Sequence, residues 1–215
     1  MKRYSLYLVD MDDTLYEERQ YVLSGFRVLS GVASNYLGIS PAQVFGFMQE
    51  YFDRQGRNGV LDALLVAHGK EPAAAVIADW VAAYRNHMPE ICLYPGVLDA
   101  LVAIRQMGAR IYIVTDGLTC MQEKKFSALG LEQYVDGIVY CHETGYPKPD
   151  PRALSGLVAN GQADAVLIGD RPDRDLALAA NLGIDAIRIR TRRFAHQGNV
   201  PWAPVGEYGS FADAL

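Results

Sequence analysis

Short apolar segments alternate with longer amphipathic segments along most of the chain. The short segments are rich in β-branched, leucine and tyrosine residues, and they predict strands at residues 5–9, 110–114, 137–140, 165–168 and 186–189. Between the later strands the spacing predicts helices at residues 97–107, 121–129, 151–160 and 173–182. Strand and helix therefore alternate from about residue 95 onward, which is typical of an α/β fold with a parallel sheet and helices on both faces.

The segment between the first strand and Pro95 has a different pattern. It predicts helices at residues 25–37, 41–51, 59–68 and 72–85, without a convincing strand among them. Pro41 and Pro72 stand where the first turn of a helix accepts proline. We therefore expect an inserted helical unit, followed after the last strand by a tail that is irregular from Thr191 onward except for a short helix at residues 210–215.

Length and charge narrow the class of protein. The chain has 215 residues, half of them apolar, so it can bury a substantial core, and its net charge of −5 argues against wrapping nucleic acid. The apolar run behind Lys2 and Arg3 is too short for a signal peptide, and no segment approaches the ~20 apolar residues that span a bilayer. Three widely spaced cysteines form no metal or redox motif, which favours reduced thiols in a cytoplasmic protein.

Two carboxylates follow the first strand. Asp10 comes directly after it and Asp12 two residues later, at the sheet edge where ligands bind in open α/β folds. Paired carboxylates at this spacing can divide the chemistry, one attacking and the other exchanging protons. Taken alone, an aspartate-rich turn or helix cap would be the more common explanation.

A second acidic group, with Asp170 and Asp175, follows the strand at residues 165–168. We expect both groups to converge on one edge of the sheet. Carboxylates packed together repel one another and raise one another's pKa unless a hard divalent cation neutralises them. Ligation by oxygen without sulfur favours Mg²⁺.

Two further loops supply polar and basic groups. Thr115, Asp116 and Gly117 end the strand at residues 110–114 and offer a hydroxyl and backbone N–H groups. Lys148 lies in a proline-flanked loop after the next strand, where it could hold a phosphate and the attacked carboxylate together. Arg54, on the helical insert, could reach the distal part of a substrate, although charges on such an insert more often form a solvated face.

Four motifs now stand in order along the chain, and they resemble those of the haloacid dehalogenase-like hydrolase superfamily. They are Asp10-Met11-Asp12-Asp13-Thr14-Leu15, then Thr115, then Lys148, then Gly169-Asp170-x4-Asp175. Gln122 and Lys125, which follow Thr115, also match the second-motif region of family phosphatases. The resemblance covers essentially the whole chain and implies a Rossmann-like catalytic core of residues 1–16 and 95–215 with a helical cap at residues 17–94.

The resemblance also implies roles by matched position. Asp10 would be the nucleophile that forms an aspartyl-phosphate, and Asp12 would protonate the leaving oxygen and later activate water. Thr115 and the backbone near Asp116 and Gly117 would bind the phosphoryl oxygens, and Lys148 would offset charge.

In the same family pattern, Mg²⁺ would be the cofactor. It would be held by Asp10, by the backbone carbonyl of Asp12 and by Asp170, with Asp175 acting through water.

The acid at Asp12 favours a phosphatase over a 2-haloacid dehalogenase, whose leaving group needs no proton. A phosphomutase and a non-catalytic binding protein stay open as alternatives. We expect a Mg²⁺-dependent phosphohydrolase that cleaves small phosphomonoesters such as nucleotide, sugar or related metabolite phosphates. Three stretches, residues 12–16, 51–56 and 139–141, resemble pyrimidine 5'-nucleotidase-like members. The expected partner is a small phosphorylated metabolite, not a nucleic acid polymer or a membrane, and the expected state is a monomer or homodimer.

Overall fold

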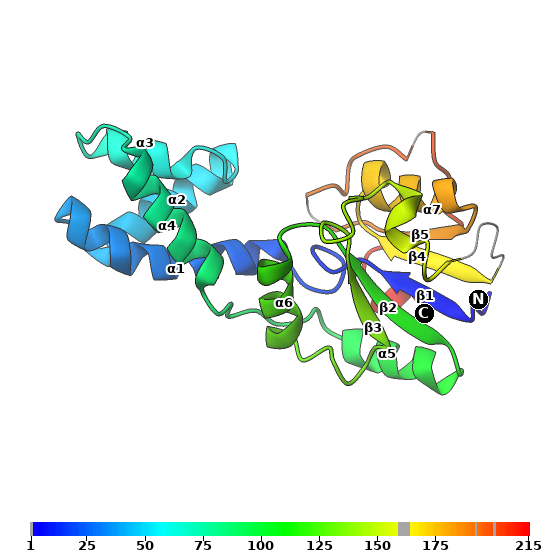
Figure 1. The fold of residues 1–215 in the computed structure, drawn as a ribbon. Helices are drawn as coiled ribbons and strands as arrows, with labels where there is room; N and C mark the ends of the chain where they lie inside the picture. The colour runs from blue at the N-terminus through cyan, green and yellow to red at the C-terminus, as the bar shows by residue number, and fades with distance from the viewer. Residues whose placement is uncertain (1, 159–163, 192, 200) are drawn as a thin grey trace. The chain divides into compact units, whose positions relative to one another are not determined.

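The computed structural model describes residues 2–158, 164–191, 193–199 and 201–215. The chain forms two compact units (Figure 1). One comprises Met1–Glu18 together with Cys92–Leu215, and the other comprises Arg19–Ile91. The second unit is therefore inserted into the first after the loop that follows the first strand.

The first unit contains a parallel sheet of six strands in the order β3-β2-β1-β4-β5-β6. The strands are β1 (Leu6–Val9), β2 (Arg110–Thr115), β3 (Gly137–Tyr140), β4 (Ala165–Gly169), β5 (Asp185–Ile189) and β6 (Gly206–Tyr208). The predicted α/β class with a parallel sheet is confirmed. The prediction of an irregular tail is wrong at β6, a three-residue strand that pairs with β5 through Ile187, Arg188 and Ile189.

The helices of the first unit are α5 (Val97–Gln106), α6 (Thr119–Ala128) and α7 (Ala177–Leu182), with short turns η1 (Pro151–Leu154), η2 (Pro172–Leu176) and η3 (Ala212–Ala214). The helix predicted at 151–160 is only the 3₁₀ turn η1 followed by further turns up to residue 158, and residues 159 and 160 lie outside the described part. Ser155 and Gly156 are weak helix formers, which accounts for the early end. The helix predicted at 173–182 begins as the π turn η2 and continues as α7.

The core of the first unit lies on both faces of the sheet. Every residue of β1 and of β4 is buried, as expected for central strands of a parallel sheet. Helices α7 and α5 lie on opposite sides of the sheet (Figure 1). Leu6 and Leu8 of β1 belong to one apolar cluster with Leu167 of β4 and Leu178 of α7. The buried strands thus hold the loops at their carboxyl ends in a fixed frame.

The tail after β5 is anchored by a buried arginine. Arg188 is fully buried, and its guanidinium donates hydrogen bonds to the carbonyl oxygens of Phe194 and Gln197, each at 2.7 Å. Burial lowers the pKa of Arg188, with the nearby Arg190 adding to the effect. The segment that follows β5 therefore folds back over this side chain.

The second unit is built of helices. They are α1, which begins in the first unit (Glu18–Leu37), α2 (Pro41–Gln55), α3 (Val60–Ala67) and α4 (Ala74–Asn86). Their shared core includes Phe26, Met48, Leu64 and Trp80. Helix α1 starts seven residues earlier than predicted, where the Glu18 backbone N–H donates to the Asp13 carboxylate at 2.9 Å. None of the helices in the described part of the chain combines the length and the apolar character of a membrane-spanning segment.

Candidate active site

Asp10 is held at the carboxyl end of β1 by contacts to both carboxylate oxygens. Its backbone N–H donates to the Ile168 carbonyl at 2.9 Å, which continues the pairing with β4. The Lys148 ammonium donates to Oδ1 at 2.6 Å and the Thr14 hydroxyl donates to Oδ2 at 3.1 Å. Burial raises the pKa of Asp10, Lys148 opposes that rise, and the neighbouring Asp175 adds to it. The carboxylate is fixed in direction and lies in a site where its charge needs compensation.

Lys148 is the cation at the centre of the site. Besides Asp10, its ammonium donates to Oδ1 of Asp175 at 2.7 Å and to the Val114 carbonyl at 3.2 Å, so all three of its protons are used. Burial by itself lowers the pKa of Lys148, but the carboxylates of Asp10 and Asp175 outweigh burial and raise it well above its ordinary value. Lys148 therefore keeps its charge.

The Lys148 loop is braced by Asp116. The Asp116 carboxylate accepts a hydrogen bond from the Lys148 backbone N–H at 3.0 Å, and the Arg174 guanidinium donates to the Lys148 carbonyl. The side chain of Asp116 thus holds the loop, whereas the sequence pattern assigned Asp116 to substrate through its backbone. Gly117, the next residue, has a φ of 109°, a backbone conformation that residues other than glycine rarely adopt.

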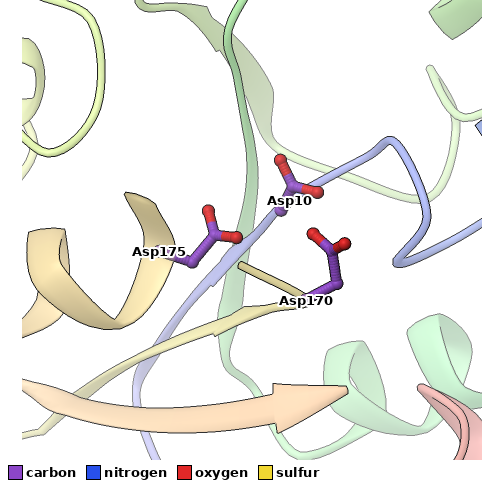
Figure 2. A group of neighbouring side chains, drawn as sticks. All are labelled: Asp10, Asp170 and Asp175. Atoms are coloured by element: carbon purple, nitrogen blue, oxygen red, sulfur yellow. The ribbon is translucent and has the colours of Figure 1, made fainter. Parts of the chain in front are cut away.

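Asp10, Asp170 and Asp175 form a cluster suited to a divalent cation. One carboxylate oxygen from each lies within 4.8 Å of the others, and Figure 2 shows the three groups directed toward one another. Among the described residues, Oδ2 of Asp170 is buried without a hydrogen-bond partner. Burial, followed by the charges of Asp10 and Asp175, raises the pKa of Asp170 to about 9.

The charge count and the donor chemistry of this cluster agree. Three carboxylates against the one ammonium of Lys148 leave two negative charges, which the two positive charges of one divalent cation would balance. All three side chains offer oxygen, the donor that Mg²⁺ prefers. The residues present therefore fit a magnesium ion.

Asp175 reaches this cluster because glycine precedes Asp170. Oδ1 of Asp175 accepts from Lys148, and Oδ2 accepts from the Arg171 backbone N–H at 3.0 Å. A β-carbon on Gly169 would lie 2.4 Å from Cγ of Asp175, closer than packed atoms allow. Only glycine at this position lets the Asp175 carboxylate lie over the end of β4.

Asp12 is directed to a separate set of donors. Oδ1 accepts from the Lys125 ammonium at 2.7 Å and from the Tyr16 hydroxyl, and Oδ2 accepts from the Gln122 amide at 2.8 Å. Burial by itself raises the pKa of Asp12, but Lys125, Tyr16 and Gln122 together outweigh burial, so the pKa lies below its ordinary value. In this arrangement Asp12 is a carboxylate, ready to accept a proton.

Thr115 is linked to Asp12 through Gln122. It is buried at the end of β2, and its hydroxyl oxygen accepts from the Gln122 amide at 2.5 Å. Sequence reasoning matched Gln122 and Lys125 to a family pattern but gave neither a contact with Asp12. Their spacing of three residues, which puts both on one helix face, was the available signal.

Arg54 lies on α2 in the helical unit. Its exposed guanidinium pairs with Glu50 at 2.6 Å, one helical turn away. Such surface pairs contribute little to stability, so the pair does not prevent another use of the side chain. Contact between Arg54 and a substrate stays a prediction.

Comparison with known proteins adds three findings. A family model described as haloacid dehalogenase-like hydrolase matches residues 4–183. A glyceraldehyde 3-phosphate phosphatase of Methanopyrus kandleri is 28% identical over 87% of this chain and 84% of its own length. The pyrimidine 5'-nucleotidase YjjG of Escherichia coli is 30% identical over 60% of this chain and 61% of its own.

Among solved structures, the HAD-hydrolase YfnB of Bacillus subtilis, determined with magnesium bound, has a similar fold. It superposes with a TM-score of 0.71 at 22% sequence identity, and the superposition covers 99% of this chain and 97% of the YfnB chain. At this identity the likeness concerns the fold.

Proposed function

The chain belongs to the haloacid dehalogenase-like hydrolase family and is a phosphatase, and we propose that it hydrolyses small phosphomonoesters through an aspartyl-phosphate on Asp10 with Mg²⁺ as cofactor. The observation that carries the proposal is the buried trio of Asp10, Asp170 and Asp175 around Lys148, which has the charge and donors of a magnesium site next to a fixed carboxylate. Phosphoryl transfer requires this kind of positioning and charge stabilisation.

In the first step Asp10 is the nucleophile. A bond forms between a carboxylate oxygen of Asp10 and phosphorus while the bond from phosphorus to the ester oxygen breaks. The leaving oxygen takes a proton from Asp12, so Asp12, which is a carboxylate in the structure, must first take up one proton from solvent. The proton that Asp12 removes from water in the second step restores this protonated form for the next cycle. Contacts from Lys148 and Thr14 hold the Asp10 carboxylate in one direction, which supports attack along a defined line.

In the second step water replaces Asp10 on phosphorus. Asp12, now a carboxylate, removes a proton from water, the new bond from oxygen to phosphorus forms, and the bond from phosphorus to Asp10 breaks. Inorganic phosphate leaves and both aspartates return to their starting bonds. The lowered pKa of Asp12 favours this step, because its carboxylate is the form that accepts the proton.

The remaining site residues bind charge. Thr115 and the backbone N–H groups of Asp116 and Gly117 are assigned to the phosphoryl oxygens, and Lys148 offsets their charge. Asp10, Asp170, the backbone carbonyl of Asp12 and, through water, Asp175 would hold the magnesium ion. When bound, Mg²⁺ supplies charge neutralisation at the phosphoryl oxygens and at the carboxylates.

The substrates of the relatives support a small phosphomonoester. The names of the relatives specify glyceraldehyde 3-phosphate in one case and pyrimidine 5'-nucleotides in another, which share a phosphate on a primary carbon. We assign the inserted helices of Arg19–Ile91 to the choice among such substrates, as a cap, with Arg54 as a candidate contact.

Replacement of Asp10 by asparagine tests the nucleophile. Turnover of p-nitrophenyl phosphate in Mg²⁺ should disappear, while circular dichroism and the melting temperature should show a folded protein. Asp173→Asn is the matched control, because this aspartate is close in sequence but pairs with Arg171 outside the cluster, and its activity should persist. Retained turnover by the Asp10 variant would refute the assignment.

The covalent intermediate can be tested separately. In Asp12→Asn, p-nitrophenolate can leave without a proton, but water lacks its base, so the protein should accumulate one phosphoryl group. Intact-protein mass spectrometry after acid quenching measures this, and the added mass should be absent from the double variant that also carries Asp10→Asn. No added mass in the Asp12 variant at any time would contradict an aspartyl-phosphate route.

A further inference from the structure

Helix α6 buries a polar face. Its buried residues are Gln122, Lys125 and Phe126, at the spacing that would normally carry the apolar face of a helix packed on a core. Two of these three side chains can form several hydrogen bonds, and one carries a charge. Packing alone does not account for that choice of residues.

Lys125 is the more costly of the two polar residues to bury. Its side chain is only 4% exposed, and lysine is rarely buried without a charged partner because the ammonium loses its hydration. One charged partner of Lys125 is Oδ1 of Asp12 at 2.7 Å, on a carboxylate that remains 24% exposed. The lysine is therefore enclosed, while its partner keeps an open side for a reacting molecule.

The contacts on Asp12 fix more than its charge. Lys125 and the Tyr16 hydroxyl donate to one oxygen and Gln122 donates to the other, so donors from two directions set the plane of the carboxylate. A lone ion pair would leave the group free to rotate about its last bond. Donors on both oxygens remove that freedom, and the aspartate enters the reaction in one orientation.

We propose that Lys125 is a positioning residue that holds the Asp12 carboxylate in the orientation needed for proton transfer to and from the reacting oxygens. This inference rests on the proposed function, in which Asp12 exchanges protons while Asp10 attacks. Lys125 acts through Asp12, whereas Lys148 acts on Asp10 and the metal cluster. The two buried lysines thus serve different carboxylates.

The test compares two aryl phosphates of similar shape. p-Nitrophenolate leaves without a proton, whereas phenolate is more basic and depends on one. In Lys125→Met, which keeps the length of the side chain without its charge, kcat/KM for phenyl phosphate should fall by about 10- to 100-fold, part of what general acid catalysis contributes. kcat/KM for p-nitrophenyl phosphate should change little, so the ratio of the two constants is the readout.

A double-mutant cycle separates positioning from general damage. In an Asp12→Asn background the change Lys125→Met should cost phenyl phosphate turnover little more, because the residue through which Lys125 acts is already disabled. Lys70→Met removes one positive charge from an exposed site in the helical unit, and it should leave the ratio unchanged. If Lys125→Met does not fold, Lys125→Gln keeps a hydrogen-bond donor and should shift the ratio in the same direction by less.

Equal losses for both aryl phosphates, or full additivity with Asp12→Asn, would overturn the inference. The proposed function has its own test in Asp10→Asn. If Asp10→Asn is inactive while Lys125→Met leaves the ratio unchanged, only the role of Lys125 fails. If Asp10→Asn stays active, the proposed chemistry fails first.

Discussion

Replacing Asp170 with asparagine should stabilise the metal-free protein while removing its activity. The Asp170 side chain is buried beside Asp10 and Asp175, and Oδ2 of Asp170 has no hydrogen-bond partner among the described residues. An amide of nearly the same shape removes the repulsion but also removes a metal ligand. As long as no cation is bound, the folded protein should therefore be less stable with aspartate at position 170 than with asparagine.

The magnitude follows from the spacing of the carboxylates. At 4.8 Å, the limit on the ligand-atom distances in the cluster, two like charges repel by roughly 3.5 kcal/mol at an effective dielectric constant of about 20. Asp170 faces the negative charges of Asp10 and Asp175, and the positive charge of Lys148 cancels about one of them. The repulsion from about one carboxylate is therefore left. An unpaired buried amide costs roughly 1 kcal/mol in return. The net gain is about 2 kcal/mol, or a rise of about 4–8 °C in melting temperature for a chain of this length.

The gain should depend on pH with a defined sign. The pKa of Asp170 is raised to about 9 in the folded protein from an ordinary value of 3.8, so the folded state prefers the protonated acid. At low pH Asp170 is protonated in the wild-type protein and the repulsion is absent. As pH rises through the folded pKa, the carboxyl group ionises and the repulsion lowers the stability of the folded protein. The advantage of Asp170→Asn should be small near pH 5 and increase toward pH 9.

The assay is thermal melting in EDTA at several pH values, followed by melting in Mg²⁺. At a concentration 100 times its dissociation constant the ion should stabilise wild type by about 2.7 kcal/mol and the variant much less. Asp173→Asn, which removes one charge outside the cluster, is the control and should show neither effect. A metal-free variant that melts below wild type at pH 8, or an equal difference at pH 5 and pH 8, would refute the reasoning.

Three further predictions concern the frame of the site. Gly169→Ala should lower stability by about 1–3 kcal/mol and also lower kcat, because its new carbon must displace the Asp175 carboxylate, and chemical denaturation with steady-state kinetics measures both. At pH 8 iodoacetamide should modify exposed Cys120 in the native protein but not Cys141, since burial raises the pKa of Cys141 to about 12, and peptide mass spectrometry distinguishes them. Gln122→Leu should lower kcat/KM for both aryl phosphates, about 10-fold for p-nitrophenyl phosphate and more for phenyl phosphate, because the Gln122 amide donates both to the buried Thr115 hydroxyl and to Asp12, and an unchanged kcat/KM for p-nitrophenyl phosphate would contradict this.

Much of the fold could be predicted from the sequence, because the central strands are apolar on both faces and stand out from their polar surroundings. Strand β6 could not, since three residues are too few for a periodic pattern and its pairing depends on the position of β5. The sequence pattern also places the start of α1 too late, for a related reason. Its first turn is stabilised by Asp13, a residue that belongs to the preceding loop.

The active site likewise contains residues that the sequence predicts and contacts that it does not. Asp10, Asp170 and Lys148 could be named because each follows a strand and because their combined charge makes chemical sense. The contacts of Lys125 with Asp12 could not, since they join residues 113 positions apart through the packing of α6. A sequence pattern can identify the reacting groups, whereas the donors that orient them depend on the tertiary structure.

The buried Arg188 has a consequence for shortened versions of this protein. The family model matches residues 4–183, and none of the four family motifs lies beyond residue 183. A chain cut soon after β5 would leave the Arg188 guanidinium in the interior without the carbonyl oxygens of Phe194 and Gln197, and would leave the open edge of β5 without β6. An unpaired edge strand favours aggregation, and a buried charge that has lost its partners destabilises the fold. The segment after β5, although it contains none of the four motifs, therefore limits how far the protein can be truncated from its C-terminus and still remain in solution.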